Sequence, residues 1–180
     1  MFEVARRAVL DEVALLLCES EQRSWYPGRF FDPVEDNEPH LTHAVEAFER
    51  AVQAASTAGM PLSRIALVGF SQGACVLTEL LRRRPRAYGG AAVLTGALMG
   101  EPPPDGRLPP PPDGMITGLR IHFSASRHDE WIPLEHALAA SRYFQRAGAH
   151  VTTAVSDEAD HDVSHAEATS LRRLVDELLL

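Results

Sequence analysis

The pentapeptide Gly69-Phe70-Ser71-Gln72-Gly73 is the part of this chain whose residue types and spacing most clearly suggest chemistry. It follows the apolar run Ile65-Ala66-Leu67-Val68 and precedes a helix-like stretch from Ala74 to Arg84. A G-x-S-x-G pattern between a strand and a helix is typical of a nucleophile elbow, whose sharp turn holds the serine hydroxyl clear of the sheet. The flanking glycines keep the turn uncrowded, and the free N–H groups of the new helix point toward the reacting centre. We therefore expect Ser71 to be a nucleophile, the alternative being a glycine-flanked turn without chemistry.

A serine nucleophile needs a base to take its proton, and the base needs a third group to fix its tautomer. Asp129 follows the predicted strand 119–124 by a short loop, and His161 follows the predicted strand 151–155 in the same way. The order serine, aspartate, histidine along the chain is the one found in α/β-hydrolases. We predict Asp129 as the acid and His161 as the base.

Other residues of these two loops are alternatives for the same roles. Glu130 would be the acid if its loop ran one residue longer, and His165 is an alternative base. Asp157 and Asp160 are interpreted as solvated loop acids. His161 and His165 have the i, i+4 spacing of a metal pair, but the loop lacks a third well-spaced ligand, so no metal site is predicted.

The elements that must position these groups alternate along the chain between apolar strands and amphipathic helices. This pattern predicts an α/β fold with a mostly parallel sheet flanked by helices, in which chemistry sits on loops at the carboxyl ends of the strands. The 180 residues fit a single domain, and the proline-dominated segment 101–114 is expected to be a surface loop. The expected strands are 13–18, 65–68, 91–95, 119–124 and 151–155, and the expected helices are 2–11, 41–58, 74–84, 134–147 and 166–180.

Composition excludes several classes of function. The net charge is −8 and no basic run stands out, which argues against nucleic acid as a partner. No apolar stretch approaches the ~18 residues of a membrane span, and the acidic N-terminal region is wrong for a signal peptide, so a cytoplasmic location is the default. Cys18 and Cys75 are expected to be small core residues. The remaining histidines are expected on the surface or flanking helices: His40, His43, His122, His128, His136 and His150.

Three segments together resemble the phospholipase/carboxylesterase family, the group that includes acyl-protein thioesterases. They are the elbow Gly69–Ala74, the acid loop ending in Trp131-Ile132-Pro133, and His161-Asp162-Val163-Ser164. Ser24-Trp25-Tyr26-Pro27 and Asn37-Glu38-Pro39 are similar to the bacterial branch of that family. The resemblance extends over essentially the whole chain from about residue 12.

This resemblance implies an α/β-hydrolase fold and hydrolysis of carboxylic esters or thioesters of small-molecule acyl substrates, without metal or organic cofactor. It implies Ser71 as nucleophile, His161 as general base and acid, and Asp129 as the group that orients the histidine. The backbone N–H of Gln72 would supply one half of the oxyanion hole. Candidates for an apolar acyl pocket, each equally compatible with plain packing, are Trp25, Leu98 and Met99.

The chain departs from the family at its N-terminal side. Family members begin with strands before residue 1 of this chain, one of which ends in a His-Gly loop that supplies the second oxyanion donor, and this sequence contains no His-Gly pair. The missing strand would lie between segment 13–18 and the elbow strand, so we expect an N-terminally truncated sheet. A start further upstream, direct pairing of the two strands, or a second chain, as in a homodimer, would each fill the gap. The alternative function is a weak or inactive α/β-hydrolase-like binding protein.

A smaller departure is Asp160, where the family has glycine before the histidine. Acidic neighbours favour the charged imidazolium, so the pKa of His161 is expected above the ~6.5 of free histidine.

Overall fold

The computed structural model describes residues 2–8, 10, 13–20, 23–100, 116–157 and 163–179. Within these residues the chain forms one parallel sheet of four strands in the order β1-β2-β3-β4. The strands are β1 (Ala66–Phe70), β2 (Gly90–Leu94), β3 (Arg120–Ser126) and β4 (His150–Ser156). The predicted proline-rich loop 101–114 lies outside the described residues.

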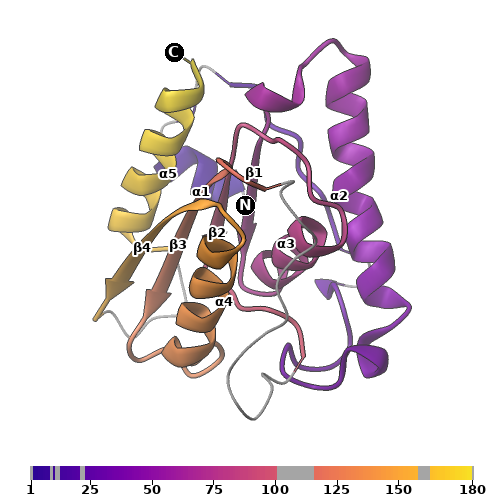
Figure 1. The fold of residues 1–180 in the computed structure, drawn as a ribbon, viewed down its shortest axis with the longest axis vertical. Coiled ribbons are helices and arrows are strands. Elements are labelled where there is room, and N and C mark those ends of the chain that lie inside the picture. Colours follow the sequence, from indigo (N-terminus) through magenta and orange to yellow (C-terminus); the bar gives the residue numbers. More distant parts are fainter. Residues whose placement is uncertain are drawn as a thin grey trace.

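Helices cover both faces of this sheet (Figure 1). They are α1 (Phe2–Arg7), α2 (His40–Thr57), α3 (Gln72–Arg83), α4 (Leu134–Arg146) and α5 (His165–Leu179), with short 3-10 turns η2 (Val34–Asn37) and η3 (Leu62–Arg64). Five predicted helices and four of the five predicted strands are confirmed, with ends that differ by a few residues. This is the α/β arrangement that the alternation of apolar strands and amphipathic helices predicts.

The two faces of the sheet have separate apolar cores. On one face, α2, α3 and α4 pack over β1, β2 and β3, with Leu77, Phe123 and Phe144 fully buried. On the other face, α1 and α5 pack over Leu94 and its neighbours in β2, with Leu171 buried between them. All five residues of β2 are buried. This strand pairs with β1 on one side and β3 on the other, so its position in the core sets the positions of both neighbours.

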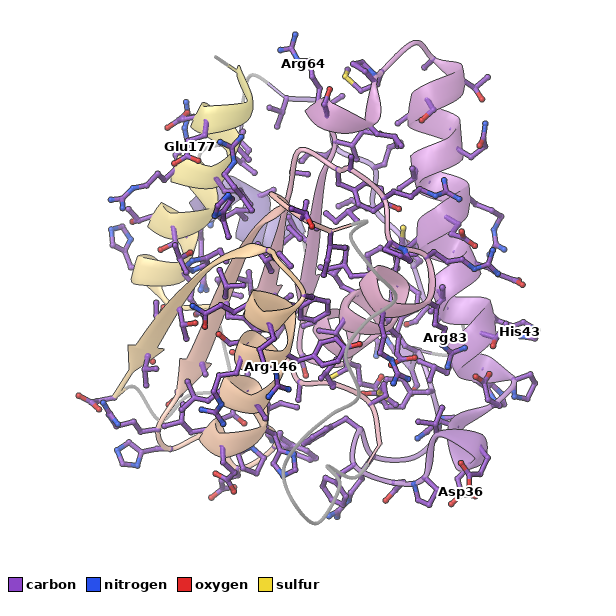
Figure 2. All side chains as sticks on the ribbon, viewed as in Figure 1. Asp36, His43, Arg64, Arg83, Arg146 and Glu177 are labelled. Atoms are coloured by element: carbon purple, nitrogen blue, oxygen red, sulfur yellow. The ribbon has the colours of Figure 1, made fainter. Side chains whose placement is uncertain are left out.

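A buried ionic network ties α3 to α2 and the segment before it. Glu79 of α3 is fully buried, and Arg83 donates Nε to its carboxylate at 2.6 Å. Arg83, labelled in Figure 2 beside α2, also binds Glu38 at 2.9 Å and the Thr42 hydroxyl at 3.1 Å. Burial works against ionisation of Glu38, but hydrogen bonds from Thr42 and Arg83 lower its pKa overall. Arg82 Nε lies 2.8 Å from the other Glu79 oxygen, although the pair is poorly aligned for a hydrogen bond.

The predicted strand at 13–18 is wrong. The described structure contains no strand there, and the side chains of Leu15, Leu16 and Leu17 are 41%, 57% and 49% exposed. Direct pairing of this segment with β1 is therefore also wrong: β1 is an edge strand of the described sheet. At one end of the segment, Val13 packs against the core that α1 and α5 form with β2, and at the other end Cys18 Sγ lies 3.8 Å from the Ala47 carbonyl of α2. Without a neighbouring strand its backbone has no ladder to join.

Candidate active site

Ser71 is the residue at which β1 turns into α3. Its φ of 54° and ψ of −124° put it in a region that non-glycine residues rarely adopt. Its own N–H donates to Leu94 of β2 at 3.0 Å, and its carbonyl accepts the N–H groups of Ala74 and Cys75. These bonds hold the turn to both the sheet and the helix, so the half-buried serine is placed by the backbone rather than by side-chain packing.

The first amides of α3 lie directly beside Ser71. In the described part of the chain, no acceptor pairs with the N–H groups of Gln72 and Gly73, as expected at the start of a helix. Two unpaired N–H groups at the positive end of a helix favour negative charge at this point. The predicted oxyanion donor, Gln72 N–H, is thus available.

The side chain of Gln72 forms hydrogen bonds with the segment 24–26. Its Oε1 accepts the backbone N–H of Trp25 at 3.1 Å and the Ser24 hydroxyl at 3.3 Å, while Nε2 donates to the Tyr26 carbonyl at 3.1 Å. The residue after the serine therefore fastens the segment 24–26, distant in sequence, onto the elbow. Sequence reasoning assigned Gln72 only its amide and missed this contact.

Asp129 sits in a tight turn three residues beyond β3. Its Oδ1 accepts the backbone N–H groups of Trp131 at 2.7 Å and Ile132 at 2.8 Å. The two backbone hydrogen bonds to Oδ1 hold the Asp129 carboxylate in place. Asp129 is half-buried whereas Glu130 is exposed; the choice of Asp129 as the acid stays a prediction.

The predicted base His161 lies outside the described residues, and so does its neighbour Asp160. The two described residues that were weighed beside it are both exposed. Asp157 pairs with Arg127 at 2.8 Å on the surface, and its side chain is 81% exposed, in line with its interpretation as a solvated acid. The alternative base His165 is the first residue of α5 and is also exposed.

The segment after His161 is anchored to the sheet through a buried glutamate. Ser164 and Glu167 form a capping box at the start of α5: the Ser164 N–H donates to Glu167 Oε2 at 2.6 Å, and the Glu167 N–H donates to the Ser164 hydroxyl at 3.2 Å. The other carboxylate oxygen of Glu167 accepts the Ser124 hydroxyl of β3. Sequence reasoning missed this anchor, although the S-x-x-E spacing before an apolar run signals it.

The three predicted pocket residues occupy two different environments. Leu98 and Met99 are 7% and 3% exposed and belong to the main core. Trp25 is half-buried beside the elbow, with its ring 5.9 Å from that of Phe48 at a tilt of 46°. Their contact with a substrate stays a prediction.

His122 is not a surface residue, and the prediction that placed it there is wrong. It lies on β3, is 9% exposed, and its Nδ1 is 3.1 Å from the Thr152 hydroxyl. Burial lowers the pKa of its imidazole, partly offset by Glu167 and reinforced by Arg173. It lines a groove of about 620 Å³ along α5 and β4, at the amino ends of the strands and thus at the opposite end of the sheet from Ser71.

In the described ranges, no helix has the length and apolar character to cross a membrane. In the same residues, no three or more His, Cys, Asp or Glu side chains gather closely enough to hold a metal ion.

Comparison with known proteins gives one matching family and several similar structures. The sequence profile of the family described as Phospholipase/Carboxylesterase matches residues 13–178. A phospholipase/carboxylesterase from Dyadobacter fermentans DSM 18053 is 27% identical, with a TM-score of 0.76 over 86% of this chain and 72% of that one. A single-residue variant of SOBER1 from Arabidopsis thaliana has a TM-score of 0.79 at 18% identity over 98% of this chain and 91% of the other, which shows the shared fold.

Among curated proteins, Esterase YpfH of Escherichia coli (strain K12) is 30% identical to this chain over 107 residues. The match covers 59% of this chain and 42% of that protein, so the chain spans about two fifths of the length of this relative.

Proposed function

This chain belongs to the phospholipase/carboxylesterase family, and we propose that it is a serine hydrolase that cleaves carboxylic esters or thioesters through an acyl-serine intermediate. The observation that carries the proposal is the backbone of Ser71, with φ 54° and ψ −124° between β1 and α3. Holding a non-glycine residue in such a conformation costs about 1–3 kcal/mol. A strained serine raised between strand and helix is typical of a nucleophile elbow.

In the proposed reaction, the Ser71 hydroxyl attacks the acyl carbon while His161 takes its proton. Negative charge develops on the carbonyl oxygen and is stabilised by the Gln72 N–H at the start of α3. The alcohol or thiol then leaves with the proton from His161, and water attacks the acyl-serine by the same path in reverse. Asp129, whose carboxylate is held in place by its own turn, would orient His161.

The first experiment is hydrolysis of p-nitrophenyl butyrate by the purified chain and its Ser71→Ala variant. Removing a serine nucleophile should lower kcat by at least ~10³-fold. Ser63→Ala is the matched control, since Ser63 is exposed on η3 and contacts nothing at the elbow, and it should keep the full rate.

A fluorophosphonate probe separates this proposal from a non-catalytic binding protein of the same fold. An activated serine should be labelled covalently, and the label should map to Ser71 and vanish in Ser71→Ala. A folded sample that shows neither Ser71-dependent turnover nor labelling would overturn the hydrolase and favour the binding protein.

A further inference from the structure

Trp25 places an N–H donor beside the first turn of α3. A methyl group built on Gly73 would lie 3.5 Å from Nε1 of the Trp25 indole. No residue in the described ranges accepts a hydrogen bond from this nitrogen, and it is not among the polar atoms sealed from solvent. The indole N–H is therefore an open donor near the unpaired amides of Gln72 and Gly73.

The position of the Trp25 ring is restrained from two sides. Its backbone N–H donates to Gln72 Oε1 at 3.1 Å, so the residue is fastened to the elbow itself. Its ring packs against Phe48 of α2 at 5.9 Å between centroids. A donor held in this way loses little conformational freedom when an acceptor arrives, which is what electrostatic stabilisation of a transition state requires.

The distances place the indole edge beside the first turn of α3. Because a C–C bond adds about 1.5 Å, Nε1 lies within about 5 Å of the Gly73 Cα. Two donors that each bind one acceptor at ~2.9 Å can lie up to about 5.8 Å apart, so the separation of the indole from this turn is of the size that one shared oxygen spans.

We propose that the indole N–H of Trp25 is a second donor to the oxyanion, alongside the backbone N–H of Gln72; this inference rests on the proposed function. When the Ser71 oxygen bonds to the acyl carbon, the carbonyl π electrons move to oxygen and the serine proton moves to His161. The indole donates a hydrogen bond to that oxygen and keeps its proton. When the carbonyl re-forms, the bond to the leaving alcohol or thiol breaks and the indole bond weakens again.

The test replaces the donor while preserving the shape of the side chain. Site-specific incorporation of β-(3-benzothienyl)alanine at position 25 substitutes sulfur for N–H in the same bicyclic ring, and Trp25→Phe is the second variant. Loss of one oxyanion donor typically lowers kcat by ~10²–10³-fold, so both variants should lose about 10²-fold in kcat with KM changed less than ~3-fold. Binding of an alkyl trifluoromethyl ketone, whose serine adduct carries an oxyanion, should weaken by the same factor.

Two results would overturn the inference. A benzothienyl variant that is folded by circular dichroism and keeps the wild-type kcat and inhibitor affinity would exclude the donor role. A loss confined to long acyl chains and expressed in KM would make Trp25 a pocket wall instead. If the wild-type chain shows no Ser71-dependent hydrolysis, the proposed function fails and this inference fails with it.

Discussion

The two glycines of the elbow differ in what an added methyl group would meet, and this difference predicts opposite outcomes for the same substitution. A Cβ on Gly69 would lie 2.4 Å from the Gly73 carbonyl oxygen and 2.7 Å from the Ala74 Cα, both of them backbone atoms. A Cβ on Gly73 has Trp25 Nε1 as its nearest neighbour at 3.5 Å, an ordinary contact. Of these two glycines, only Gly69 has no room for a side chain, although the G-x-S-x-G pattern does not distinguish between them.

The size of the effect follows from these contacts. Gly69→Ala forces β1 and α3 apart, and overpacking of this kind costs about 1–3 kcal/mol. Gly73→Ala removes a glycine from a helix, which stabilises by roughly 0.5–1 kcal/mol. In a domain of this size each kcal/mol shifts Tm by about 2–4 °C, so Gly69→Ala should lower Tm by about 2–12 °C and Gly73→Ala should raise it by about 1–4 °C.

Urea and thermal unfolding followed by circular dichroism measure both variants at one protein concentration. Gly59→Ala is the control for backbone strain without crowding, because Gly59 has φ of +91° and nothing within 4 Å of its Cβ position. That variant should lose about 1–2 kcal/mol from the left-handed conformation alone. Equal stabilities for Gly69→Ala and Gly73→Ala would refute the packing argument.

Three further predictions concern regions away from the elbow. Burial lowers the folded-state pKa of His122 below its unfolded value of ~6.5. The native state therefore binds fewer protons than the unfolded state, and the free energy of unfolding should fall as pH drops below about 6.5. His122→Gln should flatten this pH dependence, measured by urea unfolding at pH 7 and 5.5. Glu79→Gln deprives Arg83 and Arg82 of their buried carboxylate and should cost about 3–5 kcal/mol in unfolding, whereas Glu46→Gln, from an exposed pair at 3.9 Å, should cost less than ~0.5 kcal/mol. Leu16→Ser removes an apolar side chain that is 57% exposed, so light scattering should show less self-association; unchanged association would mean that this side chain does not mediate it.

The sequence predicted best those features whose causes are local. The elbow needs only an apolar strand, a tight turn and a helix in succession, and all three lie within 20 residues. Helix α2 was equally clear because Leu41, Val45, Phe48 and Val52 recur at helical spacing and are all buried. Loop length favoured Asp129 over Glu130; in the structure one Asp129 carboxylate oxygen organises a turn, and the role of Asp129 as the acid stays a prediction.

The failures concern features that depend on distant neighbours. An apolar run such as 13–18 is a strand only where another strand accepts its backbone, and no local pattern reports whether one is present. His122 was assigned to the surface because histidine is usually exposed, yet strand alternation puts it on the face that α5 covers. The bonds of Gln72 to segment 24–26 join residues about 47 positions apart, so their pairing has no signature in the sequence.

Residues on either side of the loop that carries the proposed base are bonded to β3 or to Arg127 just beyond it, close in the chain to the proposed acid Asp129. At the near end, Ser156 closes β4 and accepts the backbone N–H of Arg127, just beyond β3, at 3.0 Å. At the far end, Glu167 in the first turn of α5 accepts the hydroxyl of Ser124 on β3. Because the proposed acid follows β3 by three residues and both anchors bond to β3 or to the residue after it, the relative position of the proposed acid and base depends on β3. The elbow depends instead on β1 and its bond to β2. A change at Glu167 should therefore disturb the proposed base and acid as a pair, visible as a shifted pH–rate profile and as slower fluorophosphonate labelling of Ser71, because that labelling depends on the base.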